Sequence, residues 1–89
     1  MSLAVTHPTN RPNFTKVTVG DFTVWFSYDT PIGFKDGYGT QVIATENVWG
    51  STTGKHLNHF SQKTDRIPYY DFTRRYTDAL IRRRLILDF

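Results

Sequence analysis

The chain has 89 residues, enough for one small domain with a compact core, because a domain of this size buries only about two-thirds of its unfolded surface. It has no cysteine, which excludes a disulfide framework and a thiolate metal site. Its net charge of +3 permits a polyanionic partner without requiring one. We find neither the basic and apolar regions of a signal peptide nor an apolar run near the roughly 20 residues that span a bilayer, so we expect an intracellular protein with no membrane partner.

The first segment, residues 1–12, contains two prolines and no periodic pattern. We expect it to be a flexible N-terminal arm that adds an edge contact at most. Residues 13–89 are then expected to form a single α+β domain.

A hairpin is predicted around Gly20 and Asp21, because apolar residues alternate on both sides of this dipeptide and glycine supplies the positive φ of a tight turn. The second strand places one row of apolar side chains on a single face, namely Phe22, Val24, Phe26 and Tyr28. Trp25 falls on the other face, where it either covers a second small core or lies exposed. We favour the second core.

Residues 29–33 have the composition of a turn, and Phe34 and Lys35 allow a short strand before the turn dipeptide at 36–37. A further strand is predicted at about residues 40–46. The expected sheet is therefore an antiparallel meander of three to four strands.

Two C-terminal helices are predicted to pack on this meander. The first covers residues 51–62 and is anchored by Leu57 and Phe60, three residues apart. The second follows Pro68, which suits a helical first turn, and carries a core-facing stripe of Tyr69, Phe72, Tyr76 and Ala79 or Leu80. For the apolar residues 85–89 we expect one of three outcomes: they continue this helix, return as an edge strand or form a subunit contact.

The start of the first helix has the composition of a polar binding segment. Ser51, Thr52 and Thr53 can accept hydrogen bonds from the unpaired N–H groups of the first turn, and Lys55 and His56 follow directly. The segment therefore either contacts an anion or simply caps the helix. It is not a nucleotide-binding P-loop, because only three residues separate its glycines and His56 stands where a Ser or Thr is needed.

Catalysis and metal binding have weaker support in the sequence. His56 and His59 are three residues apart, and Asp65 or Glu46 could supply a third metal ligand, but ordinary polar histidines explain the spacing better. No pair of carboxylates is placed for acid–base chemistry. We therefore expect a non-enzymatic protein without cofactor or metal.

The three runs FTVWFSYDTPIGF, ENVWGSTTGKHLN and RIPYYDF resemble a small family of uncharacterised bacteriophage proteins. The resemblance covers about residues 20–72 and rests on a Tyr-x-Thr-Pro turn followed by an Asn-x-Trp segment. The matching residues are Tyr28, Thr30, Pro31, Ile32, Asn47, Trp49, Thr52, Thr53, Lys55 and His56. It implies a viral protein in the host cytoplasm and a compact α+β domain, and it implies no activity.

Two kinds of macromolecular partner remain. A host or phage protein is favoured, with Leu85, Leu87 and Phe89 as an apolar anchor that also permits self-association into a homo-oligomer. Nucleic acid is the alternative, bound by an arginine-rich C-terminal strip. The predicted partner-binding residues in either case are Lys55, His56, Arg74, Arg75, Arg82, Arg83 and Arg84.

Overall fold

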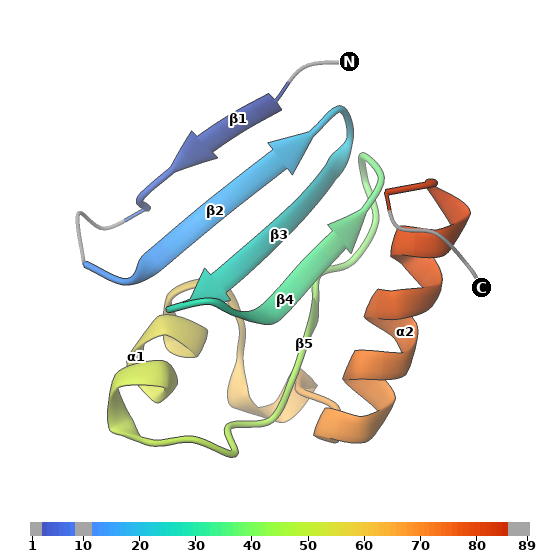
Figure 1. Cartoon of the computed structure of the whole chain (residues 1–89). Coiled ribbons are helices and arrows are strands. Elements are labelled where there is room, and N and C mark those ends of the chain that lie inside the picture. Colours follow the sequence, from blue (N-terminus) through green and yellow to red (C-terminus); the bar gives the residue numbers. More distant parts are fainter. Residues whose placement is uncertain (1–2, 9–11, 86–89) are drawn as a thin grey trace.

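The fold is a five-stranded antiparallel sheet with two helices, as seen in a computed structural model that describes residues 3–8 and 12–85 (Figure 1). The strand order follows the sequence, so the sheet is a simple meander. The strands are β1 (Leu3–Thr6), β2 (Phe14–Val19), β3 (Phe22–Ser27), β4 (Thr30–Asp36) and β5 (Ile43–Ala44). The helices are α1 (Ser51–Phe60), the short 3-10 helix η1 (Lys63–Asp65) and α2 (Tyr69–Arg82). The predicted α+β fold with two C-terminal helices is confirmed, with one strand more than the upper expectation.

The hairpin between β2 and β3 is confirmed. Gly20 has a φ of 61°, and the strands pair directly on both sides of the two-residue turn, from Val19 opposite Phe22 to Phe14 opposite Ser27. Positive φ strains residues that carry a Cβ, which explains why glycine stands at this position.

The turn predicted for residues 29–33 is wrong for residues 30–33, because β4 begins at Thr30 and includes them. The turn consists instead of Tyr28 and Asp29, and Tyr28 leaves the predicted apolar row with a φ of 56°. Proline is tolerated inside β4 because the register shifts there: Trp25 pairs with Gly33 while Phe26 pairs with Pro31, leaving one extra residue in a β-bulge.

The two edges of the sheet also differ from expectation. Within the predicted arm of residues 1–12, Leu3–Thr6 forms a complete strand, β1, that pairs with β2. The strand predicted at 40–46 is reduced to the two residues of β5. Ile67 flanks it through a parallel bridge to Thr45, because its backbone N–H donates to the Ala44 carbonyl and its carbonyl accepts from Glu46.

The sheet has an apolar core on each face. On one face Trp25 stacks on Phe60 of α1, with ring centroids 4.7 Å apart and planes 4° apart, and Phe14 and Leu57 pack beside them. The expectation that Trp25 covers a second core is therefore confirmed. Gly33 lies beneath Phe60, and a Cβ on it would overlap the end of that ring, so a larger residue requires Phe60 to shift.

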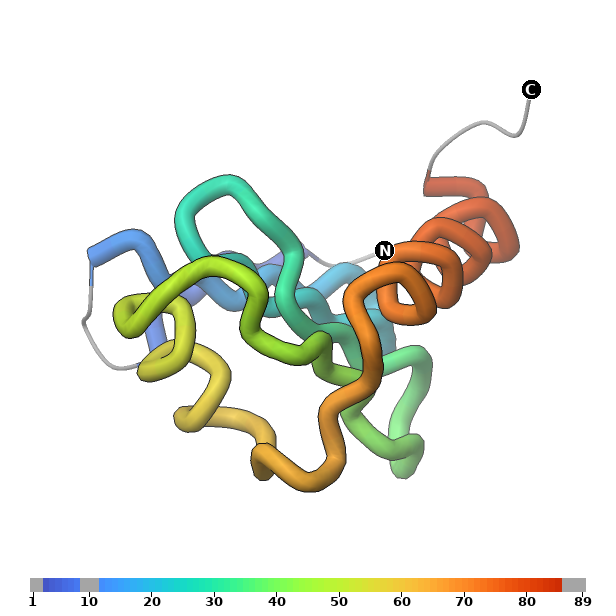
Figure 2. The backbone as a smooth tube through the Cα atoms, turned by 90° about the horizontal axis from the view of Figure 1, so that it is seen from below, coloured from blue at the N-terminus to red at the C-terminus, as the bar shows by residue number. Residues whose placement is uncertain are grey.

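On the other face α2 packs against the middle of the sheet. Phe34 contacts Phe72 and Tyr76 of α2, and Phe22 and Val24 complete the cluster with Ala79. Figures 1 and 2 show the two helices well apart, α1 near the end of β3 and α2 alongside β4. The predicted stripe of α2 is confirmed at Phe72, Tyr76 and Ala79, whereas Tyr69 is exposed.

The end of α2 is a Schellman motif. Arg84 has a φ of 58°, its N–H donates to Ile81, and the N–H of Leu85 donates to Leu80. Leu87 and Phe89, which were expected to anchor a partner, lie outside the described residues. In the described part of the chain, no helix combines the length and apolar character that crossing a membrane requires.

Candidate functional site

His56 lies inside the protein, on the inner side of α1. Its ring stacks on Phe14 at 4.7 Å and 5°, and its Nδ1 forms a 2.8 Å hydrogen bond with the hydroxyl of Ser27. Only 1% of the residue is exposed. His56 therefore positions α1 on the sheet. The sequence analysis had instead placed it among the partner-binding residues, but its burial removes it from any exposed contact surface.

The hydroxyl residues that follow Gly50 do not cap α1. Gly50 is the N-cap, and no side chain accepts a hydrogen bond from the first turn. Thr53 points inward and forms a 3.0 Å hydrogen bond with Ser27, while Ser51 and Thr52 are exposed. The entry to the helix is held by Asn47, whose side chain donates to the Gly50 carbonyl and accepts from the Trp49 N–H. The hypothesis that Ser51, Thr52 or Thr53 caps α1 is therefore wrong. Thr53 instead helps to orient α1 through its hydrogen bond to β3.

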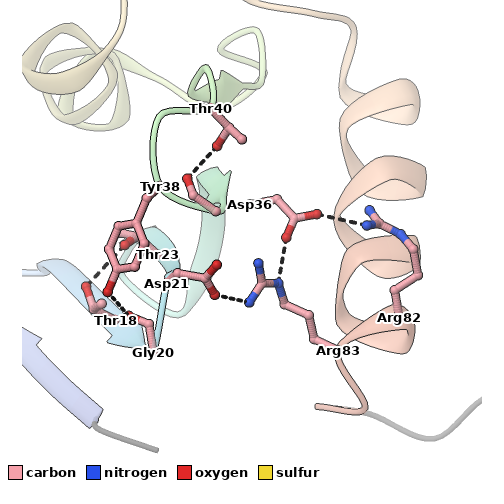
Figure 3. A network of polar contacts seen from close by, with 10 residues as sticks. Thr18, Gly20, Asp21, Thr23, Asp36, Tyr38, Thr40, Arg82 and Arg83 are labelled. Atoms are coloured by element: carbon pink, nitrogen blue, oxygen red, sulfur yellow. Dashed lines mark hydrogen bonds and ion pairs between the residues drawn. The ribbon is translucent and has the colours of Figure 1, made fainter.

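Arg83 ties the end of α2 to the sheet (Figure 3). Its guanidinium donates to Asp21 in the β2–β3 turn and to Asp36 at the end of β4, and it lies 5.1 Å from the centre of the Phe22 ring. The hydrogen bond from Arg83 lowers the pKa of Asp21, and the two carboxylates raise the pKa of Arg83. We call Asp21, Asp36 and Arg83 the arginine clamp.

The other predicted basic residues do not form one continuous strip. Arg82 lies 3.0 Å from Asp36, and Arg74 lies 3.8 Å from Asp71. Arg75 and Arg82 border a hollow of about 380 Å³ that also includes Asp36 and Asp78, so its charge is mixed. Arg84 is exposed at the end of α2, and Lys55 is exposed on the other helix. The structure therefore divides these cations between two helices and pairs several of them with carboxylates.

The histidine pair shows no geometry for metal binding. His59 is exposed and meets the Phe14 ring edge-on at 5.6 Å, while His56 is buried against the same ring. His59 and Asp65 border a hollow of about 330 Å³ that is otherwise lined mainly by amides and apolar groups. Among residues 3–8 and 12–85, no three His, Asp or Glu side chains are placed to hold one ion.

Trp49 and Tyr69 form an exposed aromatic pair that the sequence analysis did not identify. Trp49 and Tyr69 meet edge to face, with ring centroids 5.3 Å apart and planes 88° apart. Both side chains remain exposed, Trp49 to 42%, and so do their neighbours Val48 and Tyr70. We call Val48, Trp49, Tyr69 and Tyr70 the aromatic patch.

Two chain segments that are distant in sequence hold this patch. The isolated bridge between Thr45 and Ile67 joins the two segments, and the side chain of Glu46 accepts a 3.4 Å hydrogen bond from the Tyr69 N–H. Beside the patch, Glu46, Asn47, Lys63 and Arg66 line a hollow of about 390 Å³. Two sequence features indicated this site: the adjacent tyrosines that follow Pro68, and Trp49, which lies outside any strand pattern. The bridge that joins the two segments is not visible in the sequence.

The geometry offers little for catalysis in the described residues. Ser27 and His56 are bonded as a nucleophile and base would be, but both are buried within the α1 core, so a substrate has no access to them. The exposed features are the aromatic patch, the uncharged edge strand β1 and scattered cations. These features lie on the surface and could contact a partner, but they do not enclose a substrate.

Comparison with known proteins gives one match. Residues 1–77 match a family described as "Family of unknown function (DUF8033)". No curated protein and no solved structure matches the chain. Because the match extends over most of the sequence, the chain belongs to this family of unknown function.

Proposed function

We propose that this chain is a non-catalytic bacteriophage accessory protein that binds another protein in the host cytoplasm, using the aromatic patch as its contact surface. The viral origin is supported by the resemblance of the Tyr28 turn and the Trp49 segment to phage proteins. The binding mode is supported by the exposed edge-to-face pair of Trp49 and Tyr69, which is the single observation that carries the proposal.

Tryptophan and tyrosine are the residues that most often dominate the binding energy of protein interfaces. Here Val48, Trp49 and Tyr70 are 52%, 42% and 76% exposed, so the patch has apolar area that a partner can bury. The ring pair and the bond from Tyr69 to Glu46 fix the patch in advance. Binding then loses less conformational entropy than it would on a flexible loop.

The adjacent hollow gives the contact a polar rim. It places Lys63 and Arg66 beside Glu46, so the cations outnumber the carboxylate. Arg66 is held in position because it donates hydrogen bonds to Asn58 and Ser61. Such a rim favours a partner with acidic residues around its apolar contact, because complementary charge increases the rate of encounter.

The alternative, nucleic-acid binding through the arginine-rich end, has less support. Arg83 and Arg82 contact Asp21 and Asp36, and a phosphate would have to compete with these carboxylates. Arg75 and Arg84 remain as exposed cations in that region. Two cations neutralise at most two phosphates and so give only weak binding.

The test is capture from a lysate of the bacterial host by the wild type, Trp49→Ala and a matched control, Tyr38→Ala. Tyr38 is also an exposed aromatic residue, at 83%, but lies in the β4–β5 loop away from the patch. We expect the wild type and the control to capture the same protein and Trp49→Ala to lose it while its melting temperature stays within a few degrees.

Capture by Trp49→Ala at the wild-type level would contradict the proposal. An electrophoretic shift of DNA or RNA at low salt is measured in parallel. A shift that Arg75→Ala and Arg84→Ala abolish together, with no protein captured, would replace the proposal by the alternative.

A further inference from the structure

The outer edge of β1 is open. β1 pairs with β2 on one side, and no strand among residues 3–8 and 12–85 pairs with its other side, where Figure 1 shows it at the margin of the sheet. The opposite edge is different, because Ile67 occupies hydrogen-bonding groups beside β5. An open edge presents unpaired backbone N–H and C=O groups to any strand of suitable shape.

Apart from its short length, β1 lacks the features that normally prevent edge pairing. Its sequence is Leu-Ala-Val-Thr, without charge, proline or bulge. All four residues are exposed, Leu3 to 68% and Val5 to 58%, so β1 adds no buried side chain to either core. An uncharged strand of this kind stabilises the monomer little. Pairing on its second side would add backbone hydrogen bonds and bury its apolar side chains.

The register shows which side chains extend towards this edge. Leu3 lies opposite Val19, and Val5 lies opposite Val17. Since opposite residues of an antiparallel pair share a face, Leu3 and Val5 extend the apolar rows that run through Val19 and Val17 to the α2 side of the sheet. Ala4 points to the other face and lies midway between the two apolar residues.

We propose that a second copy of this chain pairs with β1 antiparallel, about a two-fold axis through Ala4, and so joins two sheets into one continuous sheet. In this register Leu3 lies opposite Val5 of the second copy, and Val5 lies opposite its Leu3. Both apolar rows then cross the seam on one face. With the axis at Ala4, a Leu3–Val5 pair forms on each side of the axis. A shift by one residue would instead place the apolar side chains of the two copies on opposite faces of the joined sheet.

A second copy fits this edge better than a charged partner because β1 is neutral and its pattern is complementary to itself. A four-residue strand contributes only a small contact area, below that of stable dimers, so the association is weak and reversible. The contact is distinct from the aromatic patch and does not depend on the function proposed for it.

Disulfide trapping tests the register directly, since the chain has no cysteine of its own. Facing residues of an antiparallel pair have Cα atoms about 4.5–5.5 Å apart, within the range of a disulfide. Ala4→Cys should therefore form a disulfide dimer under mild oxidation at least about tenfold faster than Thr77→Cys, an exposed control on α2. Equal rates for the two variants would overturn the proposal.

Sedimentation analysis at protein concentrations up to about 1 mM tests the contact without a thiol. Val5→Lys introduces charges at the seam and should shift the protein to monomer. Val48→Lys, the same change at a similarly exposed valine of the aromatic patch, should leave the dimer intact. A wild type that stays monomeric throughout, or a dimer that Val5→Lys does not weaken, would contradict the proposal. Loss of partner capture by Val48→Lys alone separates this contact from the proposed function.

Discussion

The two faces of the sheet are covered in different ways. On the face of α1, a polar group is buried within the core: Ser27 bonds to Thr53 and His56, and His56 stacks on Phe14. On the face of α2, the core is apolar and the polar contacts lie at its rim, in the arginine clamp.

The difference shows how polar groups orient two short helices without weakening the cores. α1 has ten residues with few apolar anchors, and directional hydrogen bonds from β3 fix its position. α2 has fourteen residues and a longer apolar stripe, so packing orients it and the clamp holds only its end. Charge at the C-terminal end of α2 therefore serves the fold, whereas Trp49 and Tyr69 remain exposed.

The largest effect is expected from truncating the core of either face. Phe72→Ala should lower the free energy of unfolding by about 3–5 kcal/mol, and Leu57→Ala by about 2–5 kcal/mol, because both side chains are fully buried. The two faces share β3, so urea unfolding of each variant should remain a single transition. A variant that loses one face in a separate step would show that the cores are independent.

The next effect concerns the tight contact beneath α1. Gly33→Ala should destabilise the protein by about 1–3 kcal/mol, because the new methyl group meets Phe60. Phe60→Leu should recover part of this loss in the double variant, and unfolding midpoints measure the coupling. Fully additive losses would contradict the packing described here.

The arginine clamp predicts a smaller effect that depends on pH. Arg83→Met should lower stability at pH 7 by about 1–2 kcal/mol, because it removes the hydrogen bonds to the carboxylates and the contact with the Phe22 ring. The effect stays modest because solvent screens the more exposed Asp21. Arg74→Met is the control and should change little, since the ion pair of Arg74 with Asp71 is 3.8 Å long and lies on the surface.

The sign of the pH dependence follows from Asp21. Its pKa is lowered in the folded protein, chiefly by the hydrogen bond from Arg83, so its contribution is present above its ordinary pKa and is lost as pH falls through the lowered value. The stability difference between wild type and Arg83→Met should therefore shrink below about pH 4. A difference that is constant from pH 7 to pH 2 would exclude this ion pair as its cause.

The smallest expected effect is a gain in stability. Arg84 occupies the left-handed position after α2, where glycine is preferred. Arg84→Gly should raise the free energy of unfolding by about 0.5–1 kcal/mol, and thermal melting measures it. Unchanged or lower melting would mean that the arginine side chain makes a contact that offsets its backbone strain.

Alternation and helical period were sufficient to predict the hairpin, both helices and the side of the sheet to which Trp25 belongs. The same reasoning failed at residues 30–33, where the composition favours a turn but a β-bulge accommodates Pro31 inside a strand. It allowed residues 1–12 an edge contact but did not predict the strand β1, because local pattern says nothing about where a short edge segment finds its partner.

The candidate site was predicted poorly for a related reason. Whether an arginine binds a partner or a carboxylate of its own chain depends on contacts across the fold, such as that between Arg83 and Asp21. The burial of His56 and the meeting of Trp49 with Tyr69 likewise depend on tertiary contacts. Residue type alone therefore identified candidate groups without assigning their roles.

The central claim is that the arginine clamp serves the fold and the aromatic patch serves binding. Its most direct test measures both properties, melting temperature and partner capture from host lysate well below melting, in Arg83→Met and Trp49→Ala. We predict that Arg83→Met melts lower but captures as the wild type does, and that Trp49→Ala melts nearly as the wild type does but captures nothing. The reverse assignment, with capture lost only in Arg83→Met, would contradict the account.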